Sequence, residues 1–133
     1  MNTGMDRAAI ITIALASLFA LVVGVAVGFI TTFTHRGLPP WGLTAGLAVI
    51  AALVLGFRLV FASRIIGAAA AIGAIGATAL LMLPGAGGTV FVLGDPIGYA
   101  WAIGPTVLSV LALAVPNPVA RREGAAGRSR MEP

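Results

Sequence analysis

Long apolar runs, interrupted by arginines and prolines, dominate the pattern of the chain. They cover 8–33, 41–62, 65–83 and 96–115, and none of them alternates between apolar and polar positions. A bilayer core about 30 Å thick needs about 20 helical residues to cross it. Only helices or closed barrels satisfy the backbone in lipid, and continuous runs favour helices. The pattern therefore predicts an all-α, polytopic membrane protein with a bundle of four transmembrane helices.

The same pattern predicts one transmembrane domain over 8–115, between two polar ends. The short segment 1–7 precedes it, and the basic tail 116–133 follows it and is expected to be disordered. The apolar part of a cleaved signal peptide has about 7–15 residues, so the much longer first run predicts an uncleaved helix. The glycine-rich segment 84–94 fits either an interfacial loop or a re-entrant loop.

Composition narrows the class of protein. Hydrophobic residues make up 59% of the chain and charged residues 9%, too few to cover the surface of a soluble domain. Cysteine is absent and there is one histidine, which excludes disulfides, thiolate metal sites and a multi-histidine site within one chain. We expect no cofactor, no metal ion, no enzymatic activity and no nucleic-acid partner. The lipid bilayer is the expected surrounding.

The basic residues predict the orientation. All eight are arginines, and with four spans only Arg36 falls on the side opposite to the others. The remaining ones share one side: Arg7, Arg58, Arg64, Arg121, Arg122, Arg128 and Arg130. Basic segments stay on the cytoplasmic side of a membrane, so both termini are expected in the cytoplasm.

Small residues recur at spacings that allow helices to approach closely. Gly24 and Gly28 form a G-x-x-x-G pair in the first run, the kind of motif that brings transmembrane helices together. A second small-residue face is predicted in the third run and consists of Ala69, Gly73, Gly76 and Ala77. These faces fit either a contact within the bundle or an interface between copies.

The fourth run carries its own signals for a start and a bend. Asp95 is positioned to cap the helix, and Pro96 suits its first position. Further along, Gly104 and Pro105 are expected to kink the helix, because proline removes a backbone donor.

Arg58 is the only ionisable residue within an apolar run. It is interpreted either as an anchor whose guanidinium extends to the interface, or as a functional charge. The spans contain no carboxylate for proton or sodium coupling. His35, Arg36 and Asp95 fall on the opposite side, where a solvated loop is expected rather than a catalytic site.

Residues 87–101 read G-G-T-V-F-V-L-G-D-P-I-G-Y-A-W and are followed by Gly104. This stretch resembles a family of small four-helix actinobacterial membrane proteins of unknown function. In that family a glycine-rich outer loop leads to a Gly-Tyr-aromatic pattern at the start of the last helix. The resemblance implies four spans and a bacterial inner (plasma) membrane, and it carries over no catalytic residue.

These observations lead to two expectations for function. The first is a non-enzymatic subunit or accessory of a membrane assembly, because small-residue faces are present and a coupling residue is not. The alternative is a small oligomeric transporter or flippase-like permease that uses Arg58 and the kinked fourth helix. The expected partner is accordingly another membrane protein or further copies of the chain.

Overall fold

The computed structural model describes residues 3–35, 37–83, 95–116 and 118–131, and this part of the chain is helical throughout apart from turns. The helices are α1 (Thr3–Thr34), α2 (Trp41–Val60), α3 (Arg64–Met82), α4 (Pro96–Ala114) and α5 (Pro118–Ser129). Helices α1 to α4 are long and apolar enough to cross a membrane, and the predicted all-α fold with four long apolar helices is confirmed.

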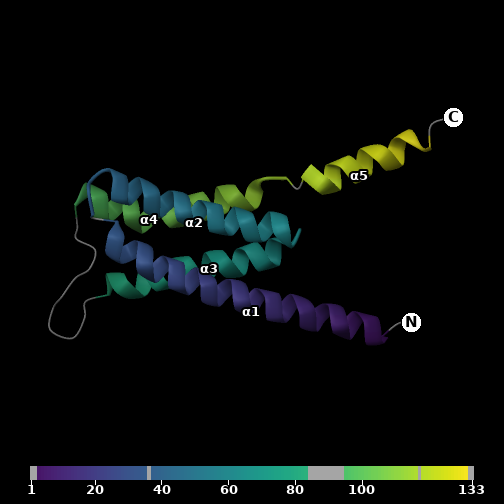
Figure 1. Ribbon diagram of the computed structural model, residues 1–133, viewed down its shortest axis with the longest axis horizontal. Coiled ribbons are helices and arrows are strands. Elements are labelled where there is room, and N and C mark those ends of the chain that lie inside the picture. Colours follow the sequence, from purple (N-terminus) through teal and green to yellow (C-terminus); the bar gives the residue numbers. More distant parts are fainter. Residues whose placement is uncertain (1–2, 36, 84–94, 117, 132–133) are drawn as a thin grey trace.

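The helix bounds follow the predicted runs closely. Disorder of the basic tail stays a prediction, and the structure describes helix α5 there, which extends away from the bundle (Figure 1). The physical reason is local: alanine, arginine and glutamate favour helix, and proline suits the first helical position. The loop 84–94 lies outside the described residues.

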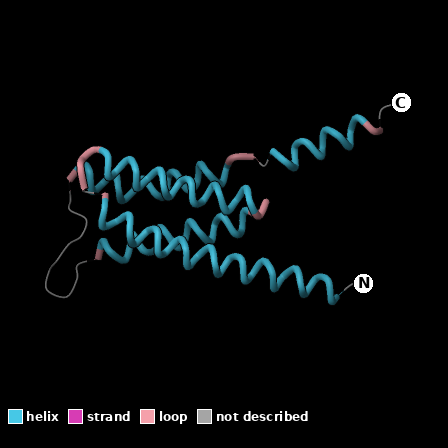
Figure 2. The backbone as a smooth tube through the Cα atoms, in the orientation of Figure 1, coloured by secondary structure: helices cyan, strands magenta, loops and turns pink. Residues whose placement is uncertain are grey.

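Successive helices of the α1–α4 bundle run in opposite directions, so α1 runs parallel to α3, on which it packs most extensively, and α2 packs against α3 and α4 (Figure 1). Both termini extend from the same end of the bundle, and the short loop between α2 and α3 lies at that end too (Figure 2). We call this the terminal end. The connection from α1 to α2 lies at the other end, which we call the distal end.

The turn at the terminal end is tight. Residues 61–63 join α2 to α3, and Ala62 adopts a φ of 49°, in the left-handed region that non-glycine residues rarely occupy. The chain therefore reverses within a few residues. Arg58, in the last turn of α2, is held close to the start of α3 as a result.

Helices α1 and α3 meet through their backbones. A Cβ atom on Gly24 or Gly28 would overlap the carbonyl oxygen of Ala70 or Ala74, and a Cβ on Gly73 would overlap the carbonyl oxygen of Leu21. Only glycine permits this approach. Dispersion contacts between closely packed backbones are a main source of helix association in lipid.

The predicted small-residue face of α3 is therefore a contact within the bundle, but Gly76 is not part of it. Ala77 is buried, and Ala69 packs against the cluster formed by Ala20, Ile66 and Ala70. A Cβ on Gly76 would meet nothing within 4 Å. Each residue turns an α-helix by about 100°. Around the helix axis, Gly76 therefore lies about 60° from Gly73 in one direction, and Ala77 lies about 40° from Gly73 in the opposite direction.

Helix α4 begins at an aspartate cap and continues across its proline. The Asp95 carboxylate accepts a hydrogen bond of 2.8 Å from the Gly98 N–H, and Pro96 takes the first helical position. Pro105 is buried inside the helix and leaves the Trp101 carbonyl without its usual donor. At Gly104, a Cβ would lie 2.6 Å from Leu47 Cδ2, so this glycine lets α2 and α4 pack closely.

The two glycines of α3 provide a matched test of this packing. We expect Gly73→Ala to lower stability by about 1–3 kcal/mol, because the new Cβ displaces the α1 backbone. Gly76→Ala adds the same methyl group in open space, so its effect should stay within about 1 kcal/mol. The measurement is the thermal unfolding midpoint in detergent. Equal midpoints for the two variants would show that the α1–α3 contact does not depend on Gly73.

Candidate functional site

Arg58 is a buried charge. It lies in the last turn of α2, its side chain is 3% exposed, and its Nε and Nη1 atoms have no hydrogen-bond partner. A guanidinium that anchors a helix at the membrane interface would instead extend into solvent or the headgroup layer. The structure therefore gives Arg58 the surroundings of an interior residue.

Apolar groups from two other helices surround the start of the Arg58 side chain. A Cβ on Gly67, in the first turn of α3, would lie 3.1 Å from Arg58 Cβ and 3.1 Å from Leu113 Cδ2 of α4. One turn earlier in α2, Val54 is fully buried and clusters with Ala71 and Ala112. The base of the Arg58 side chain therefore lies in a low-dielectric environment, where burying an unpaired ion costs free energy.

The acidic residues lie elsewhere. Asp6 is exposed in the first turn of α1, Asp95 caps α4 at its start, and Glu123 is exposed on α5. Glu132 lies outside the described residues. Within the described part of the chain, no hydrogen bond to a carboxylate reaches Nε or Nη1 of Arg58.

Two serine hydroxyls, like the Nε and Nη1 atoms of Arg58, are buried without a hydrogen-bond partner. Ser17 of α1 and Ser109 of α4 have buried Oγ atoms without a partner. At a rise of about 1.5 Å per residue, Ser17 and Arg58 each lie roughly 26 Å along their helices from the distal end, and Ser109 lies roughly 20 Å from it. All three polar groups therefore belong to the half of the bundle nearer the terminal end.

A second polar cluster, at the distal end, centres on His35. This residue was expected in a solvated loop, but it is 2% exposed and its ring stacks on Trp101 at a centroid distance of 5.0 Å. His35 Nδ1 is hydrogen-bonded to the Thr32 carbonyl oxygen. A carbonyl oxygen can only accept, so Nδ1 carries the hydrogen of this bond, and Nε2 is buried without a partner.

Three helices contribute to the His35 cluster. Trp101 Nε1 of α4 donates to Thr32 Oγ1 of α1 at 3.2 Å, and Thr32 Oγ1 donates to the Gly28 carbonyl at 2.6 Å. Thr78 Oγ1 of α3 lies 3.5 Å from Thr32 Oγ1. Trp101 is fully buried. The indole, hydroxyl and imidazole groups therefore join α1, α3 and α4 at this end.

Prediction from sequence missed His35, although one signal for it was present. Buried residues recur along α1 at intervals of three or four and end at His35: Ala20, Gly24, Gly28, Thr31, Thr32 and His35. The His35 N–H also donates to the Thr31 carbonyl at 2.9 Å, so the residue continues the last helical turn. Arg36, expected beside it, lies outside the described residues.

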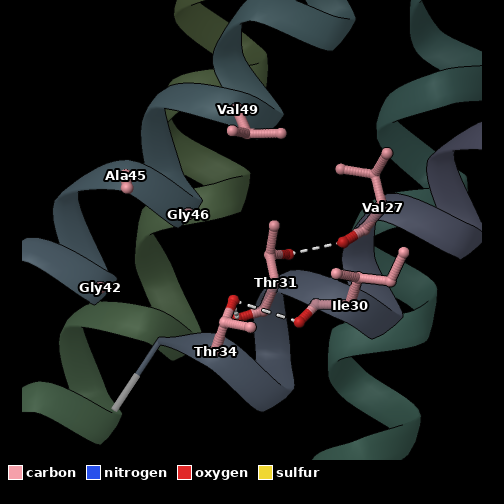
Figure 3. Close-up of a pocket in the computed structure, with 8 residues that line it drawn as sticks. All are labelled: Val27, Ile30, Thr31, Thr34, Gly42, Ala45, Gly46 and Val49. Atoms are coloured by element: carbon pink, nitrogen blue, oxygen red, sulfur yellow. Dashed lines mark hydrogen bonds between the residues drawn. The ribbon is translucent and has the colours of Figure 1, made fainter. Parts of the chain in front are cut away.

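An apolar groove of about 310 Å³ separates α1 from α2 near the distal end (Figure 3). Gly42, Ala45 and Gly46 give the α2 wall little side-chain bulk (Figure 3). On the α1 wall, Thr31 and Thr34 direct their hydroxyls to carbonyls of their own helix, at 2.7 Å and 3.2 Å. The groove therefore suits an apolar chain rather than a polar ligand.

Comparison with known proteins identified no similar protein. No family model, no curated protein and no solved structure matches the chain. The resemblance to small actinobacterial membrane proteins stays a prediction. Among the described residues, no group of three histidine, cysteine or acidic side chains could hold a metal ion.

The distal cluster leads to a prediction about Thr32. Thr32→Val keeps the shape of the side chain and leaves the buried Trp101 N–H without an acceptor, so we expect a loss of about 1–2 kcal/mol. Thr12→Val is the control, since the Thr12 hydroxyl is exposed and bonds only to the Ala8 carbonyl. The measurement is the unfolding midpoint followed by Trp101 fluorescence in a Trp41→Phe background. Equal midpoints for the two variants would contradict a structural role for the Trp101–Thr32 bond.

Proposed function

We propose that the chain is an integral protein of a bacterial plasma membrane, with four spans and both termini in the cytoplasm. Two features support this topology. Four apolar helices have the length of a bilayer crossing, and the terminal end collects Arg7, Arg58 and Arg64. The arginines of the C-terminal tail follow at the same end of the bundle (Figure 1). Excess arginine on one side is typical of cytoplasmic segments.

Within that membrane, we propose that the protein is a non-enzymatic subunit or accessory of a larger assembly. The observation that carries this proposal is the first part of α1. Residues 6–15 are exposed on every face of the helix, and Ile10, Ile11 and Leu15 are each more than half exposed. Helix α1 has 32 residues, whereas α2, α3 and α4 have 19 or 20.

The length of α1 is what points to a partner. Helices α2 to α4 span about 30 Å, one bilayer core, and α1 spans about 48 Å. If the other three helices set the membrane boundary, the start of α1 extends beyond it with large apolar side chains exposed. Burying such side chains contributes about 1.5–3 kcal/mol each. A partner helix beside residues 6–15 would supply that burial.

The alternative function, a small oligomeric transporter or flippase-like permease, has one observation in its favour. Arg58 is a buried charge without a hydrogen-bond partner at Nε or Nη1, and intramembrane charges commonly mark substrate paths.

The topology is tested by reporter fusions. We expect a fusion after Pro133 to report the cytoplasm, and one inserted near Pro39 to report the opposite side. Fusion after Val60 serves as a further check, because it should agree with Pro133. A signal from outside the cytoplasm for the Pro133 fusion would overturn the four-span topology.

Photo-crosslinking in the native membrane tests the subunit role. A photoreactive residue at Ile11 should crosslink to one defined protein, because that side chain is 57% exposed and lies roughly 35 Å along α1 from the distal end, beyond the length of α2 to α4. Val110 of α4 is the matched control, since it is 61% exposed but lies within the length shared by all four helices. Crosslinks to a single partner from Ile11 and to lipid from Val110 support the subunit role. Crosslinks only to other copies of the chain, from either position, would instead support the oligomeric permease.

A further inference from the structure

The buried guanidinium of Arg58 needs a counter-charge that the described chain does not supply. An arginine side chain keeps its proton, so it cannot relieve burial by becoming neutral. Its Nε and Nη1 atoms lack even a carbonyl partner, and the described acidic residues lie on α1, α4 and α5 away from the last turn of α2. In a low-dielectric interior such a charge is strongly destabilising unless an anion compensates it.

The depth of Arg58 indicates where that anion comes from. Arg58 lies two residues before the end of α2, at the terminal end of the bundle. In a bilayer that matches α2 to α4, this level adjoins the layer of lipid phosphate groups. A guanidinium forms short, strong hydrogen bonds with phosphate oxygens.

Two neighbouring features add positive potential at the same level. Arg64, at the first position of α3, is exposed. Ser63 takes the N-cap position of α3 but makes no side-chain cap, so the first amide groups of this helix have no side-chain acceptor. Helix N-termini attract anions through these amides and through the helix dipole.

We infer that Arg58 binds a phosphate group at the terminal end of the bundle, either on a phospholipid headgroup or as a free anion. The Arg58 side chain is 3% exposed in the structure, so binding requires the guanidinium and the groups that cover it to shift. The adjacent Gly67 has no side chain to obstruct that shift. This inference does not depend on the subunit role, because it rests on the burial of Arg58 and not on the exposed start of α1.

The test compares Arg58→Met with Arg64→Met in the purified full-length chain. Unfolding midpoints are measured in neutral detergent with phosphatidylglycerol, with diacylglycerol of the same acyl chains, and with inorganic phosphate against sodium chloride of equal ionic strength. We expect phosphatidylglycerol, but not diacylglycerol, to raise the midpoint of wild type and of Arg64→Met. Arg58→Met should lose this response, with an apparent affinity weakened about tenfold or more.

Stability without added lipid separates binding from misfolding. Arg58→Met removes an uncompensated charge, so its midpoint in lipid-free detergent should equal or exceed that of wild type. Arg58→Lys keeps the charge but not the planar fork, and native mass spectrometry should show fewer phosphatidylglycerol molecules retained on it than on wild type. A response of wild type to inorganic phosphate as large as to phosphatidylglycerol would assign the site to a free anion.

Three results would overturn the inference. One is a wild-type midpoint that responds to neither phosphate source. Another is an Arg58→Met variant that responds to phosphatidylglycerol as wild type does. The third is equal retention of phosphatidylglycerol by wild type and Arg58→Lys. None of them bears on the crosslinking result at Ile11, so the two proposals can fail separately.

Discussion

The close approach of the α1 and α3 backbones is the constraint on which the rest of the bundle depends. Gly24 and Gly28 on one helix and Gly73 on the other leave no room for a Cβ atom. In lipid, where apolar side chains gain little by leaving the solvent, such contact is a main source of helix association. The approach also brings Thr78 of α3 next to Thr32 of α1, and so positions the hydroxyl that accepts from Trp101.

The two ends of the bundle differ in whether their buried polar groups have hydrogen-bond partners. At the distal end, indole, hydroxyl and carbonyl groups satisfy one another, and among the described residues there only His35 Nε2 is a buried side-chain atom without a partner. At the terminal end, Arg58 and the two buried serine hydroxyls have no such network. A satisfied network fixes how helices pack, whereas an unsatisfied charge favours whatever anion can reach it. This difference is why we assign structure to one end and binding to the other.

The four spans and the cap of α4 could be predicted because their signals are local: run length, and an aspartate before a proline. The burial of Arg58 and His35 depends on which face of a helix meets its neighbours. Each residue ends a buried series with a spacing of three or four, which for α2 is Gly46, Ile50, Val54 and Arg58. That spacing is visible in the sequence, but a nearly all-apolar helix gives no contrast to identify it. For Gly76 the sequence predicted a contact that the structure lacks, because a small residue makes a close contact only where a neighbouring helix lies opposite.

The pairing of α1 with α3 has a consequence for how the chain assembles. The two helices are separated in sequence by the whole of α2, so the main contact of α1 does not exist until residues 64–82 have been synthesised. Until then, Gly24 and Gly28 of α1 have no backbone of α3 to pack against. Helices α1 and α2 alone therefore lack the closest contact of the bundle, and α3 completes it.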